Sequence, residues 1–225
     1  MGSRHMPDGQ AQPIRPRRGR IAQAERNDSA ILEAAREVFI ADPAAPISEV
    51  AKRAGVGIGA LYNRYANKEE LLATLCLQGQ ERYLAEVERA LDSDADPWDA
   101  YREFLARIVA ADTHSLTVRL AGTFQPTAAH RAKGERMEKL GKELFERAKA
   151  TGKLRSDVTF LDVGFLLELI AQTTLGGPAR AAELRQRQLA LIIDGLSVTH
   201  SDPLPGTPPT PAEQSARWES VDRHA

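Results

Sequence analysis

The chain has 225 residues, of which 42% are hydrophobic and 27% are charged, and its formal net charge is −1. A single cysteine, Cys76, excludes an intramolecular disulfide, and without clustered histidines there is no metal-ligand set, so we expect no metal and no cofactor. No run approaches the roughly 18 apolar residues of a membrane span, and the N-terminus lacks an apolar signal region. We therefore expect a cytoplasmic protein with no membrane partner.

The first 20 residues join a tag-like start to a basic stretch. MGSRHM, residues 1–6, looks like a tag remnant and is not expected to belong to the fold. IRPRRGR, residues 14–20, holds Pro16 and Gly19, which disfavour a helix and predict a flexible arm. Residues 1–68 carry 11 Lys and Arg against 7 Asp and Glu, and residues 69–225 carry 19 against 24. The basic arm could follow a phosphate backbone, enter a minor groove or remain a solvated tail.

Two short helices around a tight turn are predicted for residues 47–72, ISEVAKRAGVGIGALYNRYANKEELL. Gly55 ends the first helix, since glycine readily adopts the left-handed conformation, and the second begins near Gly57. Leu61 and Tyr65, one turn apart, are expected to point into the core. The remaining side is small, polar and basic, as a DNA major groove requires, and consists of Ile58, Gly59, Ala60, Tyr62, Asn63 and Arg64.

The order SAILEAAREVF, ISEVAKRAGV and GIGALYNRYANKEELL, over about residues 26–75, resembles the TetR family of bacterial transcriptional regulators. Gly57 and Ala60 depart from its pattern, where serine or threonine is common. The resemblance implies a three-helix DNA-binding domain with a helix-turn-helix over 21–70 and a helical effector-binding and dimerisation domain over 71–198. It implies DNA contacts by Ser48, Ile58, Gly59, Ala60, Tyr62, Asn63, Arg64 and Lys68, with Tyr62 and Lys68 on phosphates.

Helical patterning continues to residue 197 without a segment of alternating strand character, which predicts an all-α fold. From Thr199 the chain is rich in proline and polar residues, so the tail 199–225 is predicted to be disordered, with Trp218 as a weak anchor. The helices expected beyond the first domain cover 68–91, a segment from Pro97, roughly 115–124, 126–150, 160–177 and 178–197.

The segment after Thr159 is apolar nearly all round and needs cover on more than one side. In the TetR family the last two helices usually build a four-helix bundle between two copies of the chain, and these two look like that pair. The alternative is that they close the core of a monomer. Candidate dimer contacts are Leu166, Ile170, Leu184, Leu191 and Ile192.

The resemblance also implies a pocket for a small effector between the central helices. Aromatic and methionine side chains at helical spacing are equally typical of a plain core. Glu168 must face the pocket, pair across the dimer or reach solvent, because an unpaired buried charge is costly. His114, at a helix start, is interpreted as a local hydrogen-bonding residue. The candidate lining residues are Tyr101, Phe104, Ile108, His114, Phe124, Met137, Phe165, Glu168 and Gln172.

These patterns predict a bacterial TetR-like regulator, a repressor, that binds a palindromic double-stranded DNA operator as a homodimer and is released by a small-molecule effector. The alternative is a ligand-independent DNA-binding or interaction protein whose C-terminal half only dimerises. An enclosed cavity would favour the first and a solid core the second. An enzyme is disfavoured, since the sequence offers no nucleophile with a base, no catalytic carboxylate pair and no Gly-rich phosphate loop.

Overall fold

The computed structural model describes residues 17–114, 124–197 and 202–214. Over these ranges the chain is helical and has no named strand, which confirms the predicted all-α class. None of the helices described combines the length and apolar character that a membrane crossing requires. The helices are α1 (Arg17–Ala41), α2 (Ile47–Ala54), α3 (Ile58–Tyr62), α4 (Lys68–Leu91), α5 (Pro97–Ala110), α7 (Ala128–Ala150), α8 (Phe160–Ala171) and α9 (Gly177–Leu196).

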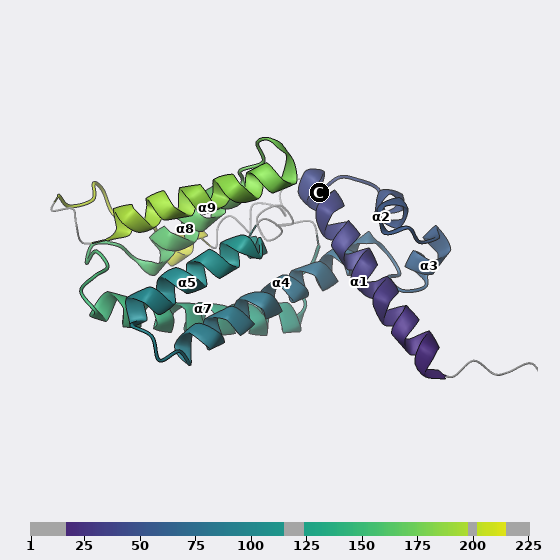
Figure 1. Cartoon of the computed structure of the whole chain (residues 1–225), viewed down its shortest axis with the longest axis horizontal. Helices are drawn as coiled ribbons and strands as arrows, with labels where there is room; N and C mark the ends of the chain where they lie inside the picture. Colours follow the sequence, from purple (N-terminus) through teal and green to yellow (C-terminus); the bar gives the residue numbers. More distant parts are fainter. Residues whose placement is uncertain (1–16, 115–123, 198–201, 215–225) are drawn as a thin grey trace, which may run out of the picture.

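Two hydrophobic cores lie at opposite ends of an elongated molecule (Figure 1). The first packs α1, α2 and α3 through residues such as Phe39, Val50 and Leu61. The second lies among α5, α7, α8 and α9. Helix α4 belongs to both, because its leucines within 71–75 enter the first core and its apolar residues within 83–87 enter the second. The long connecting helix predicted from the sequence is therefore the continuous link between the two cores.

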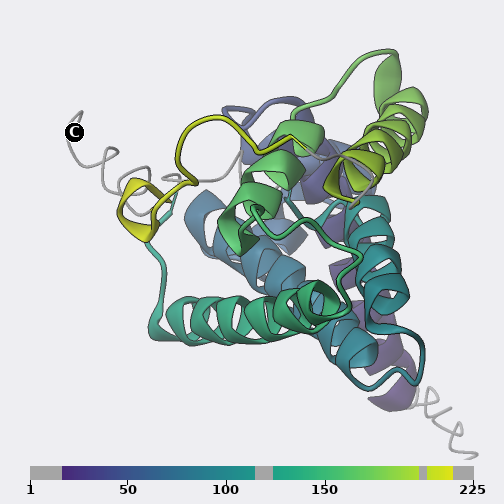
Figure 2. The same ribbon diagram turned by 90° about the vertical axis from the view of Figure 1, so that its left-hand side faces the viewer.

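The second core is an assembly of paired helices. Helix α7 packs along α4 and α5, and α9 packs against α5 and α8 (Figure 2). Gly141 allows α7 to approach α4 closely, since a Cβ at that position would lie 2.5 Å from the Tyr83 hydroxyl oxygen. The loop before α8 is tied to the end of α9, where the Arg155 amide donates to the Leu196 carbonyl at 3.0 Å.

Helix starts follow local capping chemistry read from the sequence. The Asn67 side chain accepts a hydrogen bond from the Glu70 amide at 2.8 Å, which places the start of α4 at Lys68. Pro97 opens α5, where its missing N–H is harmless. Thr159 and Asp162 form the predicted capping pair of α8.

Three helix boundaries differ from the predictions. Helix α1 already begins at Arg17, so residues 17–20 are helical and not part of a flexible arm; Pro16 precedes the helix, and Gly19 costs only about 1 kcal/mol within it. Helix α7 begins at Ala128, two residues after Pro126. Helix α8 ends at Ala171, well before residue 177. The helix predicted over 115–124 lies outside the described residues except for Phe124.

Part of the C-terminal tail is placed against the protein, so the prediction of disorder is wrong for residues 202–214. The Arg155 guanidinium donates to the Asp202 carbonyl at 2.8 Å, and the Leu204 amide donates to the Asp157 carboxylate at 2.8 Å. Arg155 and Asp157 thus supply backbone partners that composition alone did not reveal. Trp218 lies outside the described residues.

Candidate functional site

The turn between α2 and α3 has the predicted geometry. Gly55 is left-handed with φ +68°, and the Val56 amide donates to the Ala51 carbonyl at 3.0 Å. Gly57 is the N-cap of α3 in an extended conformation. Leu61 and Tyr65 are buried in the first core, as predicted. These two side chains fix which face of α3 points outward.

The outward face of α3 is open to solvent. Ile58 and Tyr62 remain 43% and 49% exposed, although a large apolar or aromatic side chain usually seeks cover. A Cβ at Gly59 would meet no other atom within 4 Å, so the backbone there can closely approach a partner. The DNA-contact candidates with exposed side chains or backbone are Ser48, Ile58, Gly59, Ala60, Tyr62, Asn63 and Arg64.

Arg64 is already engaged within the protein. Its guanidinium forms an ion pair with the Asp28 carboxylate of α1, and the Arg64 side chain remains exposed. The ion pair joins the end of α3 to α1 and neutralises part of the charge offered to DNA. Asn63, the adjacent candidate, is exposed and caps α3 through its backbone N–H, which donates to the Gly59 carbonyl at 3.0 Å.

Lys68 does not have the free ammonium expected of a phosphate-binding residue. Its Nζ donates to the carbonyls of Pro43 and Ala45, both at 2.8 Å, and lies 4.9 Å from the centre of the Phe39 ring. Two of its three donors are therefore used to hold the turn between α1 and α2. This clamp was missed by the sequence analysis, because the partners are backbone atoms more than twenty residues away.

The start of α4 is likewise occupied by the protein's own carboxylates. Glu70 accepts a hydrogen bond from the Ala66 amide at 2.7 Å, and Glu69 accepts one from the Gln125 amide at 3.1 Å. Two acidic side chains in the first turn favour the helix dipole and disfavour a phosphate at the same place. The expected pairing of Lys68 with helix-terminal amides around one phosphate stays a prediction.

The effector candidates fall into several environments. Tyr101 and Phe104 are buried in the second core, where the Phe104 ring lies 5.3 Å from that of Tyr83. Met137 is half-buried at the edge of this core. Phe124 packs against the first core and lies 5.2 Å from the His130 ring. Phe165 and Glu168 are half-buried, and Gln172 is exposed as the C-cap of α8.

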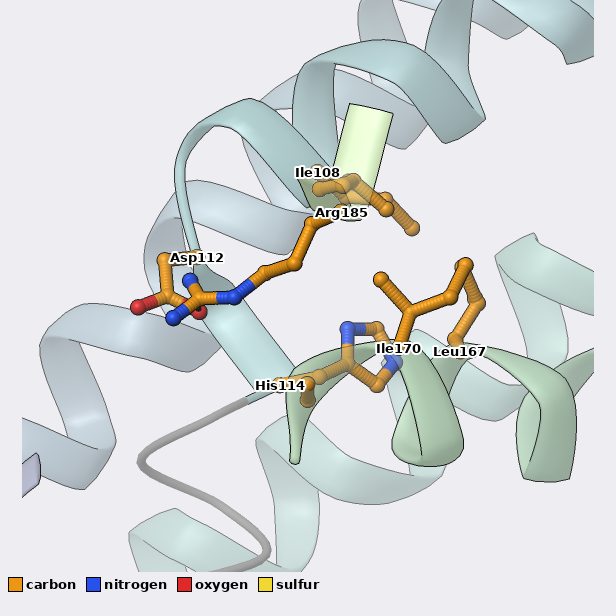
Figure 3. Close-up of a pocket in the computed structure, with 8 residues that line it drawn as sticks. Ile108, Asp112, His114, Leu167, Ile170 and Arg185 are labelled. Atoms are coloured by element: carbon orange, nitrogen blue, oxygen red, sulfur yellow. Dashed lines mark ion pairs between the residues drawn. The ribbon is translucent and has the colours of Figure 1, made fainter. Parts of the chain in front are cut away.

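A small pocket lies between α5, α8 and α9, and Figure 3 shows its lining. Two predicted residues, Ile108 and His114, line it, whereas the sequence analysis missed its charged pair, Asp112 and Arg185. The cavity volume is about 10 Å³, close to the space of one water molecule. The remaining lining residues are Val109, Leu167, Ile170 and Ala171.

His114 hydrogen-bonds locally, as predicted, through Nδ1 and the Thr113 hydroxyl at 3.2 Å. Burial lowers the pKa of His114, and the carboxylates of Glu168 and Asp112 only partly offset this effect. The ring is therefore neutral near pH 7 and contributes no fixed charge to the pocket.

The dimer candidates divide between the chain's own core and its surface. Ile170 is buried within the chain and lines the pocket, so its assignment to the interface is wrong, and Ile192 packs partly against the second core. Leu191 on α9 is 64% exposed, and Leu169 on α8, which was not predicted, is 62% exposed. Leu166 and Leu184 are half-buried.

Two family models match the chain. The one described as "Bacterial regulatory proteins, tetR family" matches residues 31–75, and "Transcriptional regulator SbtR-like, C-terminal domain" matches residues 96–198. The first range holds the turn and the exposed face of α3, and the second holds the pocket and the leucines of α8 and α9.

Individual relatives agree with these models. The chain is 26% identical to the HTH-type transcriptional repressor KstR2 of Mycobacterium tuberculosis, over 68% of this chain and 84% of the relative. It is 27% identical to the TetR transcriptional regulator SCO0520 from Streptomyces coelicolor, over 76% and 99% of the two chains, with a TM-score of 0.53. The TetR-like regulator LfrR from Mycobacterium smegmatis, solved in complex with proflavine, shares the fold at 20% identity, over 80% and 99% of the chains, with a TM-score of 0.60.

Proposed function

Since the chain belongs to the TetR family of transcriptional regulators, we propose that it represses transcription in the cytoplasm by binding a near-palindromic operator as a homodimer. A small-molecule effector releases the repressor from DNA. The observation that carries this proposal is the exposed face of α3, held outward by the buried Leu61 and Tyr65.

We assign distinct tasks to the residues of this face. Asn63 has the amide that can pair with the N6 and N7 positions of adenine in the major groove. Ile58 and Ala60 offer apolar contacts that suit a thymine methyl group. The Tyr62 hydroxyl, at the end of α3, is suited to a phosphate, and Arg64 contributes charge beside its partner Asp28. Lys68 is left out of this contact set and acts instead as the clamp described above.

The dimer is proposed to form through α8 and α9. Leu169 and Leu191 are among the most exposed large apolar residues that the structure describes, and they lie on helices that pack against each other. Two such helices from each copy would cover these leucines in an interface related by a two-fold axis. Symmetric reading of a palindrome requires the same arrangement.

A ligand-independent regulator is the second candidate, and it is favoured by the small size of this one cavity among the described residues. About 10 Å³ between α5, α8 and α9 holds one water molecule, whereas ligand sites usually span 300–1,000 Å³. The complex of LfrR with proflavine shows a small ligand on this fold in another protein. For an effector to bind between α5, α8 and α9, this cavity has to widen.

Selection and sequencing of random DNA bound by the purified protein tests the proposal. We expect a near-palindromic motif whose half-sites are centred about one helical turn apart. A single half-site, or no enrichment at all, would contradict the homodimeric reading of DNA. The Asn63→Ala variant should lose the preference at one position of each half-site, and the Ser29→Ala variant, altered at an exposed residue of α1, serves as its control.

A further inference from the structure

A hydrogen-bonded contact joins the DNA-reading end of the molecule to the C-terminal core. Arg36 of α1 donates through Nη2 to the carbonyl of Ala111 at 2.7 Å and to the carbonyl of Asp112. These carbonyls lie at the C-terminal end of α5, where the helix dipole favours a cation. The hydrogen bonds of the half-buried Arg36 guanidinium therefore depend on the position of the turn that follows α5.

The side chain of Asp112 makes a second contact in the opposite direction. Its Oδ1 lies 2.8 Å from Nη1 of Arg185 in α9. The Nε of Arg185 donates to the Thr173 carbonyl at 3.2 Å, between α8 and α9. Asp112 has φ +52°, a left-handed conformation unusual for a residue with a side chain. One strained residue thus holds Arg36 through its backbone and Arg185 through its carboxylate.

The same ion pair forms one wall of the small pocket, as Figure 3 shows. The other walls are mainly apolar and include Ile108, Leu167 and Ile170. The Arg185 side chain is 9% exposed and that of Asp112 is 20% exposed, so the carboxylate is the partner closer to solvent. A buried guanidinium without an anion is strongly destabilising. A ligand that displaces Asp112 must therefore supply a negative charge of its own.

Building on the proposed repressor function, we propose that the effector is an apolar monocarboxylic acid whose carboxylate replaces that of Asp112 on Arg185. Its hydrocarbon part widens the cavity, which has room for one water molecule at present, and packs between Ile108, Leu167 and Ile170. The displaced Asp112 moves toward solvent and releases its strained backbone, so the carbonyls that hold Arg36 shift. The effector thereby changes the position of α1 relative to α5. The ligand exchanges one carboxylate for another on Arg185, so an acid with a single charge suffices.

Calorimetric titration of the full chain without DNA tests the ligand class. The probes are butyrate and octanoate, with octanol and octylamine as matched controls of the same apolar length. Replacing Asp112 by glycine removes the competing carboxylate and suits φ +52°. An ion-paired hydrogen bond of about 1.5–3 kcal/mol corresponds to about a ten- to hundredfold change in affinity. We therefore expect the Asp112→Gly variant to bind octanoate at least about tenfold more tightly than the unaltered chain.

Arg185→Met should remove this gain when combined with Asp112→Gly, and Arg180→Met is its control, since Arg180 is exposed on the same helix and paired with Glu183. If Asp112→Gly fails to fold because its Arg185 lacks an anion, the preference of the unaltered chain for octanoate over octanol still decides the matter. Octanoate binding that equals octanol binding, or an Asp112→Gly variant that binds neither acid more tightly, overturns the assignment.

Fluorescence anisotropy with the selected operator tests the coupling. Octanoate should weaken operator binding by the unaltered chain, within the about 5- to 150-fold range typical of allosteric coupling. Arg36→Met should still bind octanoate but lose most of this effect, whereas Arg102→Met, altered at an exposed arginine of α5, should keep it. An unchanged effect in Arg36→Met overturns the coupling route. Failure to bind DNA contradicts the proposed function alone, because octanoate binding is measured without DNA.

Discussion

Replacement of Lys68 by methionine distinguishes a clamp from a phosphate contact. Methionine keeps most of the aliphatic length and the packing on Phe39 but loses the two hydrogen bonds to Pro43 and Ala45. Hydrogen bonds from a charged donor contribute about 1.5–3 kcal/mol each, and the cation–π contact adds about 0.5–1 kcal/mol. Water replaces the lost hydrogen bond at the half-buried Pro43 carbonyl, so the net loss comes mainly from the Ala45 hydrogen bond and the cation–π contact. We expect the free energy of unfolding to fall by about 2–3 kcal/mol.

Differential scanning calorimetry measures this loss. For a chain of this size, about 2–4 °C of Tm accompanies each kcal/mol, so Tm should fall by about 4–12 °C. The matched control is Lys52→Met, because Lys52 is an exposed lysine of α2 whose nearest carboxylate, that of Glu49, is 3.9 Å away. Its Tm should stay nearly constant.

The salt dependence of DNA binding tests whether Lys68 contacts a DNA phosphate. Loss of one phosphate contact lowers the slope of log affinity against log salt by about 0.9. Measured below the Tm of the variant, Lys68→Met should keep the slope of the unaltered chain. A slope reduced by about one unit with an unchanged Tm would refute the clamp and restore the phosphate role predicted from the sequence.

Three further perturbations probe other parts of the molecule. Asn63→Ala should cost about 1–3 kcal/mol on the selected operator and less on random DNA, and equal losses in filter binding would make Asn63 a backbone contact. Leu191→Glu should give a monomer in sedimentation velocity with unchanged helical content by circular dichroism, whereas Leu204→Glu, altered at an exposed leucine of the tail, should remain dimeric; a dimeric Leu191→Glu would place the interface elsewhere. Burial raises the pKa of Cys76 from 9.0 to about 11, so at pH 8 its thiolate fraction should be about a hundredfold below that of an ordinary thiol, and its rate with iodoacetamide should be lower in the native chain than in denaturant. A native rate equal to the rate in denaturant would contradict this burial.

Local signals were sufficient to predict much of the fold. The starts of α4 and α5 depend on a capping side chain or a proline within a few residues, and both were predicted correctly at Lys68 and Pro97. The turn at Gly55 and the burial of Leu61 and Tyr65 follow from conformational preference and helical period in the same way. Each of these features is decided by neighbours in the sequence.

Local sequence signals do not predict polar contacts between residues that are far apart in the sequence. Arg64 pairs with Asp28, Lys68 with carbonyls before α2, and Asp112 with Arg185, and in each case the partner is fixed by how helices pack. Periodicity indicates which side of a helix is apolar but not which charged group it meets. A signal did exist for Arg185, since it stands between Leu184 and Leu189 in a helix whose other buried positions are apolar. A charge in that setting needs a partner.

The membership of α4 in both cores has a mechanical consequence. No break interrupts its 24 residues, so at about 1.5 Å per residue it forms a rod about 36 Å long with one end in each core. If its C-terminal half tilts by about 5°, the N-terminal end travels about 3 Å, close to the 3.4 Å rise between successive base pairs. Helix α4 thus acts as a lever, and its N-terminal end, which moves furthest, lies next to α3 in the chain. A small tilt within the second core would therefore be enough to move α3 out of register with a half-site of the proposed operator.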